Sequence, residues 1–264
     1  MRGVSLIVFM FVATALAQAA EPGNFLGFRL LDLENQSVKW QSPNWGSSAA
    51  ITFAFATETT VTKGARNCGT LLPPQTAYAP SHISDRQFHR EVAAAFRMWE
   101  AAANIRFRES TDPKTANIVI GAQGKPVGRA FTNLELKPAG AGDRKVIARS
   151  MICLNPHQPW KIGFDGNLDV YDLRYTIAHE IGHAIGLDHP SAAGQLMSYR
   201  YDEKQTGLQI GDMKGAALLY GTPAGASRFS GEITTGSTRA AAMKSSAGWP
   251  FGIGEEKEKP APTR

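Results

Sequence analysis

Residues 179–189 read HEIGHAIGLDH. His179 and His183 are four residues apart, so on a helix they share one face and can bind a single metal ion. Gly186 tolerates the positive φ of a sharp turn, which brings His189 back as a third ligand. Three histidines around Zn²⁺ leave one position for water, as in catalytic zinc sites. The stretch therefore predicts a zinc site held by these three histidines.

The residue after the first histidine, Glu180, projects beside the metal instead of at it. A carboxylate there can take a proton from an attacking water, so we predict that Glu180 is a general base. The main alternative is a protein that binds zinc without catalysis, such as an adhesive protein. Glu180 argues against it, because metal binding alone does not require that carboxylate. Asp188 fits either a capping role or support of a ligand, and the sequence leaves both open.

Apolar periodicity outlines the elements around this motif. It predicts helices over 84–103, 172–187 and 210–220, the first with Ser84 and Gln87 as a capping box. Strands precede most of the helices, which is an α+β pattern. Short apolar runs predict strands at 49–56, 105–108, 117–121, 127–131 and 150–154, with a long loop over 57–81.

The N-terminus has the pattern of a secretory signal. Arg2 precedes an apolar run, and Ala17-Gln18-Ala19 offers a small-residue cleavage site. The alternative is a membrane anchor, but the run is shorter than the roughly 20 residues that a spanning helix needs. We therefore predict a signal peptide over 1–19, secretion or a periplasmic location, and no membrane contact after its removal.

Three further segments are predicted after the signal. Residues 20–44 have scattered apolar groups and are predicted to be a loose N-terminal segment. Residues 45–222 are predicted to be one folded domain. Residues 223–264 are rich in Gly, Ser, Ala, Lys and Glu and are predicted to be disordered.

Charge and cysteine content narrow the class of protein. The formal charge is +5, but it is spread thinly and gives no ground for nucleic-acid binding. The chain has two cysteines, Cys68 and Cys153. In an exported chain an isolated pair favours a disulfide over two unpaired buried thiols.

HExxHxxGxxH followed by Met197, in the stretch QLMSY at 195–199, resembles the metzincin signature. Within the metzincins the chain most resembles the matrixins, or matrix metalloproteinases, over roughly 45–221. The short separation of His189 from Met197 favours them over the serralysins. The other segments that carry the resemblance are AITFAF at 50–55, AAAFRMWEAAANIRF at 93–107, GRAFTN at 128–133 and IGDMKGAALLYG at 210–221.

This resemblance implies a fold, an activity and a substrate. The fold is a metzincin catalytic domain: a twisted, mostly parallel five-stranded sheet, three helices, and a zinc cleft between upper and lower subdomains. Met197 would form a hydrophobic floor beneath the histidines. The activity is zinc-dependent endopeptidase, with a protein or peptide as its substrate.

Three tyrosines receive roles from the same resemblance. Met-Ser-Tyr is similar to the turn of serralysins, and astacins also place Tyr there. In both groups that tyrosine reaches the zinc and stabilises the tetrahedral intermediate, so Tyr199 is a candidate catalytic residue, with simple packing as the alternative. Tyr201 corresponds to a wall of the matrixin S1′ pocket. Tyr175 corresponds to its floor, unless it packs inward and leaves the pocket to Arg200 and Tyr201.

The chain also departs from the vertebrate matrixin pattern. Residues 120–160 contain one histidine, His157, so the second, structural zinc is not expected. His82, His89 and His157 are predicted to be surface residues. A cysteine-switch propeptide is not expected either, although RNCG around Cys68 faintly resembles the switch motif.

Calcium is the second cofactor that the sequence raises. Asp165-Gly166-Asn167-Leu168-Asp169 places oxygen-bearing side chains at alternate positions, as calcium loops do. The segment lacks the glycine at position six and the distal glutamate of such loops. A turn leading into the zinc helix is therefore the favoured interpretation, with Ca²⁺ as a weaker one.

Overall fold

The computed structural model describes residues 27–140 and 142–223 of the 264-residue chain. The predicted signal at 1–19 lies outside these residues, as does the predicted tail at 223–264 except for Pro223. Within the described part, no helix has the length and apolar character needed to cross a membrane.

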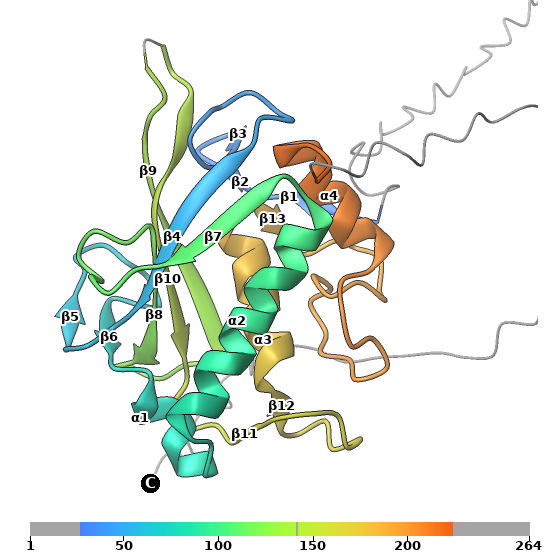
Figure 1. The fold of residues 1–264 in the computed structure, drawn as a ribbon. Coiled ribbons are helices and arrows are strands. Elements are labelled where there is room, and N and C mark those ends of the chain that lie inside the picture. Colours follow the sequence, from blue (N-terminus) through green and yellow to red (C-terminus); the bar gives the residue numbers. More distant parts are fainter. Residues whose placement is uncertain (1–26, 141, 224–264) are drawn as a thin grey trace, which may run out of the picture.

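A mixed sheet forms the centre of the domain (Figure 1). Its main strands, in spatial order, are β7, β4, β8, β10 and β9. The first four run parallel, and β9 pairs antiparallel with β10 at the edge. β9 has one neighbour in the sheet, which leaves its outer side for another strand. The bounds are Ile105–Glu109 (β7), Ala49–Phe55 (β4), Ile118–Gln123 (β8), Lys145–Leu154 (β10) and Ala130–Pro138 (β9).

The sheet is larger than predicted. Two short strands, β5 (Thr60–Val61) and β6 (Thr70–Leu72), extend it by antiparallel pairing, giving seven strands instead of five. They lie in the region predicted as a loop, as do α1 (Gln75–Tyr78) and a 3₁₀ turn at Ala79–Ser81. Elements of two to four residues between glycines and prolines are too short for periodicity to reveal.

Three longer helices form where they were predicted: α2 (Asp85–Ala102), α3 (Leu173–Ala184) and α4 (Ile210–Tyr220). With α1, the described residues contain four α-helices instead of three. The capping box of Ser84 and Gln87 is confirmed at the start of α2. Figure 1 shows α2 and α3 side by side on one face of the sheet. Their buried faces form the main core with the strands.

The predicted edge strand at 127–131 is displaced along the chain. β9 begins at Ala130 and continues to Pro138, while Val127 is exposed and Gly128 has φ +55°. The strand alternates partly buried and exposed residues in its second half, as an edge strand does, and this polar stretch hid its length. β10 likewise begins at Lys145, five residues earlier than predicted.

The described part of the N-terminal segment is packed and not loose. β1 (Arg29–Leu30) pairs antiparallel with β13 (Leu187–Asp188), and β2 (Asp32–Leu33) pairs with β3 (Gln36–Ser37). Trp40 is buried in the main core, where its Nε1 donates to the Ala184 carbonyl at 2.7 Å. This segment therefore covers the end of the zinc-motif helix. One further pair, β11 (Trp160–Lys161) and β12 (Tyr171–Asp172), leads into α3.

Candidate zinc site and cleft

The first two histidines of the motif lie on α3. The Asp172 carboxylate caps this helix by accepting the Tyr175 backbone N–H at 2.8 Å. Trp99 on α2 donates from Nε1 to the Ala178 carbonyl at 2.9 Å. Nearly every residue of α3 is buried, so the helix is held on all sides. His179 and His183 are thereby presented from a fixed scaffold.

The third histidine arrives through the turn at Gly186, whose φ is +102°. A Cβ at this position would lie 2.2 Å from the Val38 carbonyl oxygen, so only glycine fits. The chain then enters β13 and pairs with β1, and the Leu31 N–H donates to the Gly186 carbonyl at 2.9 Å. β13 ends just before His189. The predicted helix end at Leu187 is therefore too late, since α3 ends at Ala184.

The structure brings the three imidazoles together. His189 Nε2 lies 3.0 Å from His179 Nε2 and 3.1 Å from His183 Nε2. The Nδ1 atoms of His179 and His183 face the carbonyls of Leu196 and Leu187, each at 2.8 Å. A carbonyl accepts only, so each Nδ1 carries a proton and each Nε2 carries a lone pair. The three Nε2 atoms thus converge on one point, as the ligands of a shared metal ion do.

The chemistry of this donor set fits zinc. Burial and the neighbouring His183 and His189 lower the pKa of His179 well below its usual range. Burial and His183 likewise lower the pKa of His189 to about 4. Both rings are therefore neutral at pH 7, which is the metal-binding form. Ligand nitrogens about 2.0–2.1 Å from a tetrahedral zinc lie about 3.3 Å apart, close to the separations found here.

A turn around Met197 supports the triad from below. Met197 is buried, and a Cβ placed on Gly182 would lie 2.1 Å from its sulfur, so α3 and the turn are in direct contact. The buried carboxylate of Asp212, on α4, accepts the backbone N–H groups of Leu196 and Met197 at 2.8 and 3.0 Å. Because the Leu196 carbonyl accepts from His179, Asp212 supports a histidine through the turn.

A cavity of about 590 Å³ opens over the three histidines. Residues 130–134 of β9 line one side, and Leu31 and Leu33 of the N-terminal segment also contribute. Glu180 lies in the same cavity and is almost completely buried. Burial raises the pKa of Glu180, while His183 and a hydrogen bond from Thr132 oppose that shift. The Thr132 hydroxyl donates to Glu180 Oε2 at 2.7 Å.

The candidate tyrosines divide into two groups. Tyr199 lines the cavity, is 42% exposed, and meets the His189 ring edge-on with centroids 5.1 Å apart. It is therefore not a core packing residue. Tyr175 and Tyr201 are buried, contact each other edge-on at 4.9 Å, and do not line the cavity. Tyr175 therefore packs inward, as the alternative interpretation expected. Tyr201, expected at the pocket wall, is also buried away from the cavity.

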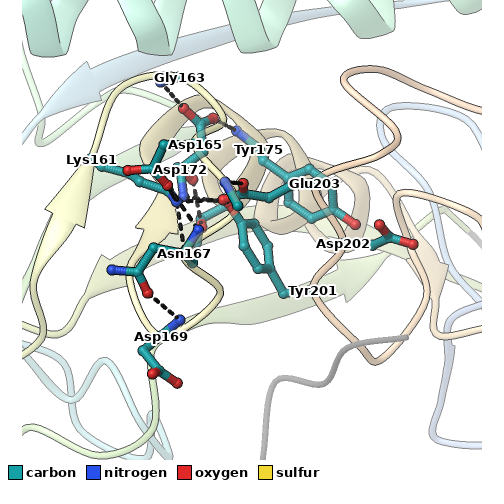
Figure 2. A network of polar contacts seen from close by, with 12 residues as sticks. Lys161, Gly163, Asp165, Asn167, Asp169, Asp172, Tyr175, Tyr201, Asp202 and Glu203 are labelled. Atoms are coloured by element: carbon teal, nitrogen blue, oxygen red, sulfur yellow. Dashed lines mark hydrogen bonds and ion pairs between the residues drawn. The ribbon is translucent and has the colours of Figure 1, made fainter. Parts of the chain in front are cut away.

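A lysine side chain, Lys161, contacts the candidate calcium-binding segment at 165–169 (Figure 2). The Lys161 ammonium pairs with the carboxylates of Asp165 and Glu203 and also bonds the Asn167 carbonyl at 2.6 Å. Burial opposes the charged form, but the hydrogen bonds to Asp165 and Glu203 outweigh it and raise the pKa of Lys161. Among the three alternating side chains of the segment, the Asp165 carboxylate is the one that contacts the lysine, while the Asn167 side chain accepts the Asp169 N–H. The contact with Lys161 favours the turn interpretation of this segment, and Ca²⁺ binding stays the weaker prediction.

The remaining histidines and the cysteines occupy different places. Cys68 and Cys153 form a disulfide, as predicted, which joins the β5–β6 region to β10. His82, His89 and His157 are exposed. Within the described residues, the group of side chains placed to bind a metal ion is the triad.

Two contributors to the site, Thr132 and Asp212, were not singled out from the sequence, and the role of a third, Asp188, was left open. Thr132 lies in GRAFTN, but nothing in a polar residue of an edge strand signals contact with Glu180. Asp212 lies in the first turn of α4, where its carboxylate also accepts the Gln209 N–H at 2.7 Å. Asp188, which the sequence left open, accepts the His189 N–H at 2.7 Å and pairs with Arg29 at 3.3 Å. Apart from the contact between the adjacent residues Asp188 and His189, these contacts join separate segments of the chain, which apolar periodicity does not report.

The mixed sheet, the zinc-motif helix and the methionine turn define a metzincin-type metalloprotein. A family model described as matrixin matches residues 75–221, more than half of the chain. The chain therefore belongs to the matrixin family. The match does not address the serralysin-like Met-Ser-Tyr turn.

Several matrix metalloproteinases are similar to this chain. Metalloendoproteinase 1 of Glycine max is 28% identical over 160 residues, covering 55% of this chain and 49% of the relative. Stromelysin-3 of Rattus norvegicus is 30% identical over 150 residues, covering 54% of this chain and 29% of the relative. Neutrophil collagenase of Homo sapiens is 26% identical over 159 residues, covering 54% of this chain and 31% of the relative. The alignments thus span half or less of these relatives.

Proposed function

We propose that this chain is a zinc-dependent endopeptidase that hydrolyses internal peptide bonds of protein substrates. The observation that carries the proposal is the convergence of three imidazoles beside a buried glutamate in one open cavity. His179, His183 and His189 would hold the ion. Zinc in such a site supplies a Lewis acid and an activated water.

Glu180 has the position required of the general base. It lines the cavity next to the histidines, and burial raises the pKa of its carboxylate, which favours acceptance of a proton. Glu180 would take the proton of the attacking water and pass it to the leaving amine. The rival role of binding zinc without catalysis gives no use to this carboxylate.

The substrate would bind as an added strand. The outer side of β9 has no strand partner among the described residues, and residues 130–134 line the cavity. An extended peptide paired with this edge would place its backbone along the histidines. Tyr199, exposed beside His189, would offer its hydroxyl to the developing oxyanion.

Export is part of the proposal. Its support is the signal-like pattern at 1–19, together with the disulfide, which persists in oxidising compartments. Expression of the full chain in a secreting host, followed by N-terminal sequencing, should show loss of these residues. Retention of Met1 in exported protein would contradict it.

Incubation with an unfolded protein substrate tests the proposed activity. Mass spectrometry of the products should show new termini inside the substrate. A zinc chelator should stop the cleavage, and added zinc should restore it. Products trimmed only from their ends would contradict an endopeptidase, and cleavage unaffected by the chelator would contradict a zinc enzyme.

A further inference from the structure

Thr132 lies on the cavity side of the edge strand. Successive side chains of a strand point to opposite faces. Asn133 faces away, where its Oδ1 accepts the backbone N–H groups of Asn67 and Cys68 at 3.1 and 2.8 Å. Thr132 therefore faces α3, half-buried and lining the cavity. Its hydroxyl lies 2.7 Å from Glu180 Oε2 and 2.9 Å from the Glu180 carbonyl oxygen.

Through these two contacts, the Thr132 hydroxyl links the Glu180 carboxylate to the Glu180 main-chain carbonyl. One hydroxyl touches both the carboxylate and the main-chain oxygen of the same residue, so the carboxylate is fixed relative to the helix that carries the histidines. Fixed orientation is what a proton acceptor in an active site requires, since small displacements of a reacting group reduce rates strongly. A glutamate without such a contact has several side-chain torsions to restrict.

A hydroxyl also suits both halves of a proton transfer. It can donate one hydrogen bond and accept others. When Glu180 is a carboxylate, Thr132 can donate to Oε2. When Glu180 holds a proton on Oε1, Oε2 can still accept the hydrogen bond from Thr132. The bridge can therefore persist while the proton moves.

We propose that Thr132 is a positioning residue that holds the Glu180 carboxylate in place for proton transfer. The inference rests on the proposed function of Glu180. The same strand offers the edge to which the substrate would pair, so Thr132 also fixes the base relative to the bound peptide. A purely structural role, in which the hydroxyl only joins β9 to α3, would affect stability and leave the turnover rate unchanged.

Two substitutions separate these roles. Thr132→Val keeps the shape and removes the hydroxyl, while Thr132→Ser keeps the hydroxyl. The measurements are kcat and KM on a fluorogenic peptide, zinc content, and the thermal midpoint. Thr132→Val should lower kcat about ten- to a hundred-fold, as removal of a partner that orients a metal site's groups does. KM and zinc content should stay near the wild-type values, and Thr132→Ser should restore most of kcat.

Wild-type kcat in Thr132→Val, at any stability, would overturn the inference. So would an equal loss of kcat in Thr132→Ser, because that variant retains the hydroxyl. If valine lowers the thermal midpoint, Thr132→Ala makes the same comparison without crowding α3. Failure of the wild-type protein to cleave peptides would instead refute the proposed function itself, so the two failures are distinguishable.

Discussion

Removal of the Cys68–Cys153 disulfide should cost more stability than activity. The bridge joins residues 85 apart in sequence, and both cysteines are fully buried. The chain-entropy model gives about 4.6 kcal/mol for closing a loop of this length, and measured disulfides typically contribute about 2–4 kcal/mol. For a domain of this size, one kcal/mol shifts the thermal midpoint by about 2–4 °C. The variant Cys68→Ala/Cys153→Ala should therefore melt on the order of 10 °C lower.

The position of the bridge explains the expected separation of stability and activity. Cys153 lies on β10 opposite Phe131 of β9, and the Cys68 N–H bonds Asn133. The sulfurs support the edge strand from its far side and do not line the cavity. Once folded, the double variant should keep kcat within about threefold, since the groups that set the barrier are unchanged.

Urea unfolding of the wild type, both single variants and the double variant provides the assay. Each single substitution breaks the same bridge, so the three variants should lose similar free energies of unfolding, far from additive. Intact-mass analysis after alkylation, with and without reductant, checks the bridge directly. Two readily alkylated thiols in the unreduced protein, or a loss below about 1 kcal/mol in the double variant, would refute the reasoning.

Two further predictions concern the wall of the cleft and the loop beside it. Tyr175 packs inward against Tyr201 and does not line the cavity, so Tyr175→Leu should leave the P1′ cleavage profile unchanged; a gain in cleavage before large P1′ side chains would show instead that Tyr175 forms the floor of the S1′ pocket. Lys161→Met should destabilise the fold by about 3 kcal/mol, because Glu203 is left buried without its cation, while Lys161→Arg should retain most of that stability. In thermal melts, millimolar calcium should leave the wild-type midpoint unchanged, and a calcium-dependent rise would contradict the lysine's role as the local cation.

The convergence of the three histidines and the main elements were predictable because local rules specify them. The four-residue spacing of His179 and His183 is a property of helices, and Gly186 is required by the positive φ of the turn. The capping box at Ser84 is likewise local. Each of these features can be read within about ten residues of sequence.

The supports of the site were less accessible for a physical reason. Thr132 and Glu180, which form a hydrogen bond, are 48 residues apart in sequence. Asp212 is 16 residues from Leu196 and 15 from Met197, whose backbone N–H groups it accepts. Such contacts depend on how the sheet and helices pack. The same holds for Trp40, whose burial against Ala184 made a segment without periodicity part of the core. Lys161 lies outside the segment at 165–169, so the sequence of that segment did not indicate that a lysine would contact it.

A matched pair of variants tests the central claim most directly, by measuring zinc content and peptide cleavage together. The wild type should contain about one zinc per chain and cleave. Glu180→Ala should retain the zinc and lose cleavage by at least about a hundred-fold, since general base catalysis contributes about 10²–10⁴. His183→Ala should lose both the zinc and the cleavage activity, because the two remaining histidines are fewer than the three protein ligands of a catalytic zinc site. Near-wild-type cleavage by Glu180→Ala, or by wild-type protein freed of zinc, would contradict the account.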